Sequence, residues 1–149
     1  MADKNSIVKW QNSYTTGIKL IDEQHMELIR LTNNLFVACM EGKEKSKNAF
    51  LDTVHGVVDY VRYHFSTEEK VMERVDFPEY KKHKQEHTEF VREFFGKVEE
   101  FNSGKMMAPL TFVYYLRDWV LHHIAVNDKK IGEYIMTLKK SGEIGKLTT

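Results

Sequence analysis

Apolar residues recur at spacings of three and four along almost the whole chain, without the strict alternation that marks a half-buried strand. Such a period places the apolar side chains on one face of an α-helix. Four segments carry the pattern, and the short polar stretches between them have lengths typical of connections between antiparallel neighbours. The sequence therefore predicts an all-α protein, an antiparallel up-down-up-down four-helix bundle, with helices at about 18–41, 47–75, 78–101 and 109–138.

The residues outside these four segments form the two ends of a single domain, 1–149. Residues 1–17 make an N-terminal arm of weak periodicity, and Trp10 is expected to pack on the bundle. Residues 139–149 make a polar tail. A chain of 149 residues buries enough apolar surface for one ordinary domain, so no second domain is expected.

Local signals mark the start of the third helix. Asp76, followed three residues later by Glu79, resembles a capping box, in which side chains satisfy free backbone N–H groups of the first turn. Pro78 lies where a first helical turn tolerates proline, and Pro109 does the same for the fourth helix. These signals predict that the third helix begins near residue 78.

Histidines and carboxylates interrupt the apolar stripes of the four predicted helices. In the second helix, for example, His64 and Glu68 occupy consecutive inward positions. His55 and His122 fall out of phase with the stripes and are predicted to lie on the surface. The inward candidates for metal ligands are His25, His64, Glu68, His83, His87, His123 and Asp128.

A single core histidine is usually satisfied by a hydrogen bond and needs no metal. Two carboxylates buried together with no lysine or arginine on the same stripes are unfavourable unless cations accompany them. The seven candidates exceed the ligand number of a tetrahedral zinc site, so two metals are implied. Imidazole suits iron, copper, zinc and nickel, and helical bundles with inward carboxylates and histidines host di-iron and di-manganese sites, which favours iron.

Composition and charge narrow the range of partners. Hydrophobic residues make up 42% and charged residues 30% of the chain, as in a globular protein. Lys+Arg and Asp+Glu balance at 22 each and are interleaved, so no nucleic acid is expected as a partner. No stretch reaches the ~20 apolar residues that span a bilayer, so no membrane is expected either. The N-terminal residues lack the apolar run of a signal peptide and Cys39 lies on an apolar stripe, which favours a cytoplasmic protein with Cys39 in the core.

One step in the fourth helix is irregular. His123 and Asp128 are five residues apart, which is ~140° out of phase on a regular α-helix. The stripe keeps its spacing of three and four before His123 and after Asp128, so one extra residue is inserted between them. We expect a π-type turn, which absorbs one residue and often marks a functional site. The alternative is a regular helix in which the Asp128 side chain reaches inward through its rotamer.

The inward residues and their neighbours resemble the motifs of the hemerythrin family, and of its bacterial members in particular. The match runs from Trp10 to Asp128, and such a set, in order and at those separations, is highly specific. It comprises Trp10 through Gly17-Ile18 to Ile21-Asp22-x-Gln24-His25, then His64-Phe65-x-x-Glu68, His83-x-x-x-His87 and Trp119-x-x-x-His123-Ile124-x-x-x-Asp128.

The resemblance implies a ligand for each of the seven candidates. A coordinatively saturated iron would be held by His83, His87 and His123. A second iron, with an open position for dioxygen, would be held by His25 and His64. Two carboxylates, Glu68 and Asp128, would bridge the irons together with a hydroxide or oxide. Trp119 and Val120 would belong to the oxygen pocket, where the family commonly has the larger Leu at the position of Val120.

The predicted function is reversible binding of dioxygen for storage, transport or sensing. Five neutral imidazoles leave the iron less electron-rich than the glutamate-rich sites of oxidases, which favours binding over oxygen activation. The protein is therefore not predicted to be an enzyme, beyond slow oxidase or peroxidase activity. The alternative is a di-iron enzyme that reduces peroxide, nitric oxide or dioxygen with electrons from an external reductant. A sensory module is a third interpretation, and the lack of a linked signalling domain in the sequence disfavours it.

Overall fold

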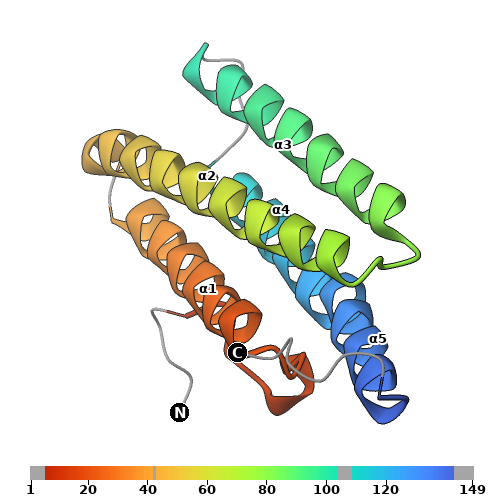
Figure 1. Ribbon diagram of the computed structural model, residues 1–149. Helices are drawn as coiled ribbons and strands as arrows, with labels where there is room; N and C mark the ends of the chain where they lie inside the picture. Colours follow the sequence, from red (N-terminus) through yellow and green to blue (C-terminus); the bar gives the residue numbers. More distant parts are fainter. Residues whose placement is uncertain (1–5, 42, 104–108, 143–149) are drawn as a thin grey trace.

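The computed structural model describes residues 6–41, 43–103 and 109–142, and for 43–49 the backbone alone; this part of the chain forms four antiparallel rods. The first three rods are α1 (Lys19–Met40), α2 (Lys43–Arg74) and α3 (Tyr80–Asn102). The fourth is made in series by α4 (Pro109–His122), the π-helix η2 (His123–Asp128) and α5 (Lys129–Lys140). α1 packs on α2 and α4, α3 packs on α2, and α5 continues the line of α4 (Figure 1). The predicted up-down-up-down four-helix bundle is confirmed.

Two helix boundaries differ from the prediction. α2 begins at Lys43 rather than near 47, because the polar stretch that was expected to be a connection is rich in lysine and glutamate, which favour helix. α3 begins at Tyr80 rather than near 78, and its N-cap residue Glu79 makes no side-chain capping bond. The predicted capping box at Asp76 is therefore wrong.

Asp76 ends α2 instead of starting α3. Its φ of 52° lies in the left-handed region, which Asp tolerates better than most residues. The Phe77 N–H donates to the Met72 carbonyl at 2.9 Å and the Asp76 N–H to the Glu73 carbonyl at 3.2 Å, which is the bond pair of a Schellman motif. Met72 and Phe77 belong to one apolar cluster, so packing reinforces the turn that returns the chain along α2.

The N-terminal arm is tied to α1. The Asn33 side chain accepts the backbone N–H groups of Ile7 at 2.9 Å and Val8 at 3.1 Å, and it donates to the Val8 carbonyl at 2.9 Å. Trp10 packs on the larger apolar cluster of the bundle, as predicted. A 3-10 turn, η1 (Asn12–Tyr14), follows.

The arm then passes between the starts of α1 and α5. Asp22 accepts the backbone N–H of Thr16 at 2.8 Å and its hydroxyl at 2.7 Å. Gly132 lies against the Thr16 carbonyl oxygen, and a Cβ at this position would collide with that oxygen. Lys129 Nζ donates to the Ser13 carbonyl at 2.7 Å. These contacts join the arm to the start of α1 and to the start of α5.

A polar layer separates two apolar clusters inside the bundle. Along α1, Ile21 belongs to the smaller cluster and Leu28 to the larger one, and the buried His25 lies between them. Cys39 is half-buried and packs on the larger cluster, which confirms its predicted packing role. No helix in the described ranges has both the length and the apolar content that a membrane crossing requires.

Candidate metal centre

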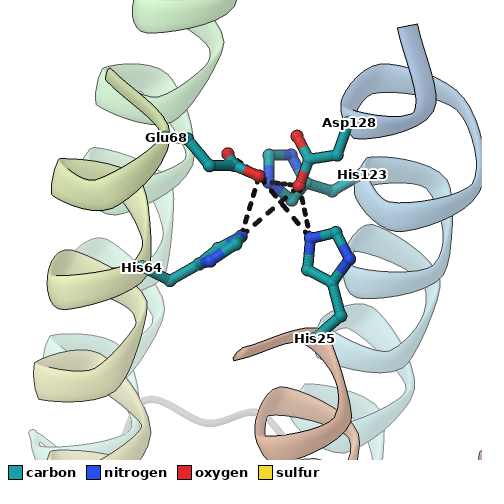
Figure 2. A group of neighbouring side chains, drawn as sticks. All are labelled: His25, His64, Glu68, His123 and Asp128. Atoms are coloured by element: carbon teal, nitrogen blue, oxygen red, sulfur yellow. Dashed lines mark hydrogen bonds and ion pairs between the residues drawn. The ribbon is translucent and has the colours of Figure 1, made fainter. Parts of the chain in front are cut away.

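All seven ligand candidates meet in the polar layer, and none is more than 4% exposed. Their ligand atoms form two overlapping groups, and within each group these atoms lie within 4.8 Å of one another. Figure 2 shows one group, with side chains from α1, α2 and the fourth rod converging on a common centre. His55 and His122 are exposed, as predicted. The two groups are His25, His64, Glu68, His123 and Asp128, and Glu68, His83, His87, His123 and Asp128.

The two oxygens of Glu68 face different histidines. Oε1 lies 3.1 to 3.5 Å from Nε2 of three histidines. Oε2 lies 3.0 to 3.5 Å from Nε2 of two others. The carboxylate therefore divides the five imidazoles into two sets. The first set is His83, His87 and His123, here called the three-histidine half, and the second is His25 and His64, the two-histidine half.

Asp128 also faces both halves. Its Oδ1 lies 3.0 Å from His83 Nε2. Its Oδ2 lies 2.6 Å from His25 Nε2 and 3.3 Å from His64 Nε2. His123 is close to the boundary between the halves, because its Nε2 lies 2.8 Å from the same Oδ2. Both carboxylates thus present oxygen atoms to both halves, as bridging carboxylates do.

A chain of hydrogen bonds determines which nitrogen of His64 carries a proton. The Tyr63 carbonyl can only accept, so the Thr67 hydroxyl donates to it at 3.1 Å and accepts from the Gln24 amide nitrogen at 3.1 Å. Gln24 Oε1 therefore faces His64 Nδ1, at 2.7 Å, and Nδ1 must be the donor. His64 Nε2 keeps its lone pair and points toward the carboxylates, which is the form of histidine that binds metals.

His87 is oriented in the same way by a different residue. Its Nδ1 lies 3.0 Å from Glu69 Oε2, and since a carboxylate oxygen accepts, Nδ1 donates. The imidazole ring stacks on Phe65, with centroids 3.7 Å apart and planes 5° apart. His87 Nε2 is therefore held toward Glu68, with its lone pair free.

Sequence reasoning missed the roles of Gln24 and Glu69. Gln24 directly precedes His25 in the chain, yet it bonds to His64, 40 residues away. Glu69 directly follows Glu68 but bonds to a histidine 18 residues away. The one sequence signal for these roles was a polar side chain next to an inward ligand candidate. Helix phase alone does not reveal which residue of the facing helix such a side chain contacts.

Burial and charge act in opposite directions on the ionisable groups of the layer. Burial disfavours charged His25 and His83, but hydrogen bonds and negative charge from Asp128 and Glu68 outweigh it, raising the pKa of His25 to about 9 and that of His83 to about 10. The pKa of His123 is raised by the same balance. Burial likewise opposes ionisation of the two carboxylates, yet the neighbouring histidines hold the pKa of each well below its ordinary value. Without a metal, protonated histidines therefore balance the two carboxylate charges, and a bound metal cation would take the place of those protons.

Several buried atoms of the layer lack a hydrogen-bond partner. They include Nε2 of His83 and His87, Oε2 of Glu68 and Oδ1 of Asp128. In the described part of the chain, no lysine or arginine forms an ion pair with either carboxylate. Nitrogen and oxygen atoms that face one another in a buried layer need a proton or a metal cation between them. Imidazole and carboxylate donors suit first-row transition metals, so the layer fits a metal site.

The two residues predicted to line the oxygen pocket have different surroundings. The Trp119 ring stacks on His123, with centroids 4.5 Å apart, and on Phe90, with centroids 3.8 Å apart. Val120 is 1% exposed and belongs to the larger apolar cluster. Trp119 thus touches a ligand candidate directly, and the contact of either residue with dioxygen stays a prediction.

Imidazoles and carboxylates gathered in a buried layer of a four-helix bundle define a metal-binding helical bundle. Residues 16–135 match the Hemerythrin HHE cation binding domain. The chain therefore belongs to the hemerythrin family, which confirms the resemblance seen in its motifs.

Two relatives and one solved structure illustrate the likeness. The bacteriohemerythrin of Pseudomonas aeruginosa is 31% identical over 119 residues, which cover 80% of this chain and 75% of that protein. The bacteriohemerythrin of Stenotrophomonas maltophilia is 28% identical over 130 residues, covering 87% of this chain and 82% of that protein. A crystal structure of wild-type hemerythrin matches with a TM-score of 0.78 and 24% identity, covering 86% of this chain and 97% of that one. At that identity, the structural likeness supports the fold alone.

Proposed function

We propose that the polar layer holds two iron ions and that the protein binds dioxygen reversibly at them, to store, carry or sense it. The observation that carries the proposal is the division of Glu68, whose two oxygens face the three-histidine half and the two-histidine half separately. A single metal ion would need no such division, whereas two ions bridged by one carboxylate require it. Membership of the hemerythrin family and the bacteriohemerythrin relatives support iron as the metal.

The unequal halves imply unequal coordination of the two irons. With one oxygen from each carboxylate, the three-histidine half offers one more protein donor than the two-histidine half. The two-histidine half would therefore leave more room for a further ligand beside its metal. A ferrous pair, when bound, would supply the electrons with which dioxygen is held.

The residues of the chain hold, orient and shield the site. Gln24 and Glu69 keep Nδ1 of His64 and His87 protonated, so that each Nε2 is free to bind. The two apolar clusters on either side of the layer exclude water. A dry site hinders the leakage of protons and the side reactions that would otherwise end reversible binding.

The second candidate is a di-iron enzyme that reduces peroxide, nitric oxide or dioxygen. A groove of about 280 Å³ favours it, because the groove is bordered by His87 and Glu69 and opens to solvent. An external reductant in this groove would lie one imidazole away from the proposed iron. Turnover requires such an electron donor, whereas reversible binding does not.

A stopped-flow experiment separates the two functions. Reduced, iron-loaded protein is mixed with dioxygen, its absorption spectrum is followed, and dioxygen is then removed under vacuum. We expect an oxy spectrum that forms, disappears under vacuum and returns over repeated cycles. Parallel runs with hydrogen peroxide or nitric oxide include a reductant. Rapid multiple turnover without a stable oxy spectrum would contradict reversible binding and favour the enzyme.

A further inference from the structure

Two of the ligand candidates are held at Nδ1 by side chains of different charge. His64, in the two-histidine half, bonds to the amide oxygen of Gln24 at 2.7 Å. His87, in the three-histidine half, bonds to the carboxylate of Glu69 at 3.0 Å. The amide is neutral and the carboxylate carries a negative charge, so the two halves of the layer have unequal partners.

A negative acceptor at Nδ1 changes the ligand as well as its orientation. A charge-assisted hydrogen bond draws the Nδ1 proton toward the carboxylate and increases the electron density at Nε2. An electron-richer Nε2 binds a metal cation more strongly, and it stabilises a ferric ion more than a ferrous ion because the ferric charge is larger. A neutral amide fixes the ring in the same orientation with a smaller effect on its electron density.

The surroundings of Glu69 leave its charge directed at His87. The Glu69 side chain is 24% exposed and borders the groove described above. Arg62 borders the same groove, but its guanidinium lies over the Phe95 ring, 4.9 Å from the centroid. Among the side chains that the structure describes, Glu69 is hydrogen-bonded to His87. Solvent screens part of this charge, but the direct hydrogen bond transmits its effect to the imidazole.

We propose that Glu69 is a positioning residue that makes the three-histidine half the tighter metal-binding and the more easily oxidised of the two halves. Gln24 is its neutral counterpart in the two-histidine half. Both residues act through an imidazole and not by contact with a metal. The inference rests on the proposed di-iron function, because it requires a metal ion in each half.

Titration of the metal-free protein with Co²⁺ tests the role of the charge without dioxygen. Glu69→Gln keeps an acceptor oxygen and removes the charge, and we expect it to weaken the tighter of two binding steps roughly tenfold. Glu69→Ala also removes the acceptor, and a loss of up to about 100-fold is expected. Gln24→Glu adds a charge beside His64 and should tighten the other step. Glu99→Gln, on the exposed face of α3, removes the same charge elsewhere and should leave both steps unchanged.

The reduction potential of the iron-loaded protein is a second readout. It is expected to rise in Glu69→Gln and to fall in Gln24→Glu, relative to the wild type and to Glu99→Gln. A residue that only orients the ring would leave the potential of Glu69→Gln unchanged, since the amide oxygen preserves the hydrogen bond. Equal Co²⁺ affinities and potentials in the wild type and Glu69→Gln therefore overturn this inference alone. Fewer than two Co²⁺ ions bound per wild-type chain would overturn the proposed di-iron function together with it.

Discussion

His123 and Asp128 are five residues apart and yet point to the same side of the fourth rod, with His123 Nε2 2.8 Å from Asp128 Oδ2. On a regular α-helix this step would leave the two side chains ~140° apart. The segment from His123 to Asp128 is a π-helix, whose wider turn absorbs the extra residue. Both side chains consequently point to the same centre (Figure 2). The π-type turn expected from the spacing is confirmed, and the alternative of a regular helix is wrong.

Exchanging Asn127 and Asp128 tests the functional role of this turn. On a regular helix the residue four positions after His123 would face inward, whereas in the π-helix it is the fifth residue that does. The double variant Asn127→Asp/Asp128→Asn is therefore expected to lose as much iron as Asp128→Asn alone, measured as iron per purified chain. Recovery of wild-type iron content in the double variant would show that the carboxylate does not depend on the π-helix.

Glu68→Ala is expected to disable the metal site far more than His55→Ala or His122→Ala. Glu68 is fully buried and faces both halves of the layer, so its loss removes the proposed bridge and leaves buried imidazoles without their anionic partner. We expect iron affinity to fall by at least about tenfold. The two exposed histidine variants should keep wild-type iron content and oxy spectrum. Equal losses in all three would contradict the assignment of Glu68 to the site.

Val120→Leu is expected to lengthen the lifetime of the oxygen-bound form in air. Val120 is 1% exposed, and a larger side chain next to the proposed open position would hinder access of water. The half-life of the oxy spectrum measures this effect. Val113→Leu, at another fully buried valine of α4, controls for overpacking of the helix. An unchanged or shorter half-life with intact iron content would remove Val120 from the oxygen pocket.

Gly132→Ala and Gly96→Ala should have opposite effects on stability. A Cβ at Gly132 would collide with the Thr16 carbonyl, so this variant should lose ~1–3 kcal/mol as the arm is displaced. A Cβ at Gly96, in α3, meets nothing within 4 Å, and the alanine should add ~0.5–1 kcal/mol through helix propensity. Urea unfolding measures both changes. A Gly132→Ala variant as stable as the wild type would mean that the arm does not press on α5.

Features that depend on position along one helix could be predicted from the sequence. Periodicity predicted the bundle, the burial of His25 and Glu68, and the exposure of His55 and His122, because each follows from the angle of a residue about its own helix axis. The π-helix was predictable for the same reason, since a single extra residue shifts the phase of everything after it. The metal-ligating role of the seven candidates stays a prediction.

Features that depend on packing contacts could not be predicted in this way. The spacing of Asp76 and Glu79 satisfies the capping-box pattern, but packing of Phe77 on Met72 favours a left-handed turn at Asp76 instead. The bond from Gln24 to His64 joins two helices whose relative rotation is set by the whole core. Helix phase contains no information about such rotations, so the pairing of Gln24 with His64 can be identified only in the assembled structure.

The number of iron ions per chain tests the central claim most directly. Protein produced with adequate iron is purified in air, and its iron and zinc contents are measured together with its concentration and absorption spectrum. The division of the two Glu68 oxygens between two sets of histidines predicts two irons per chain and the absorption of an oxygen-bound di-iron centre. A ratio near one iron per chain, or zinc in place of iron, would contradict the account.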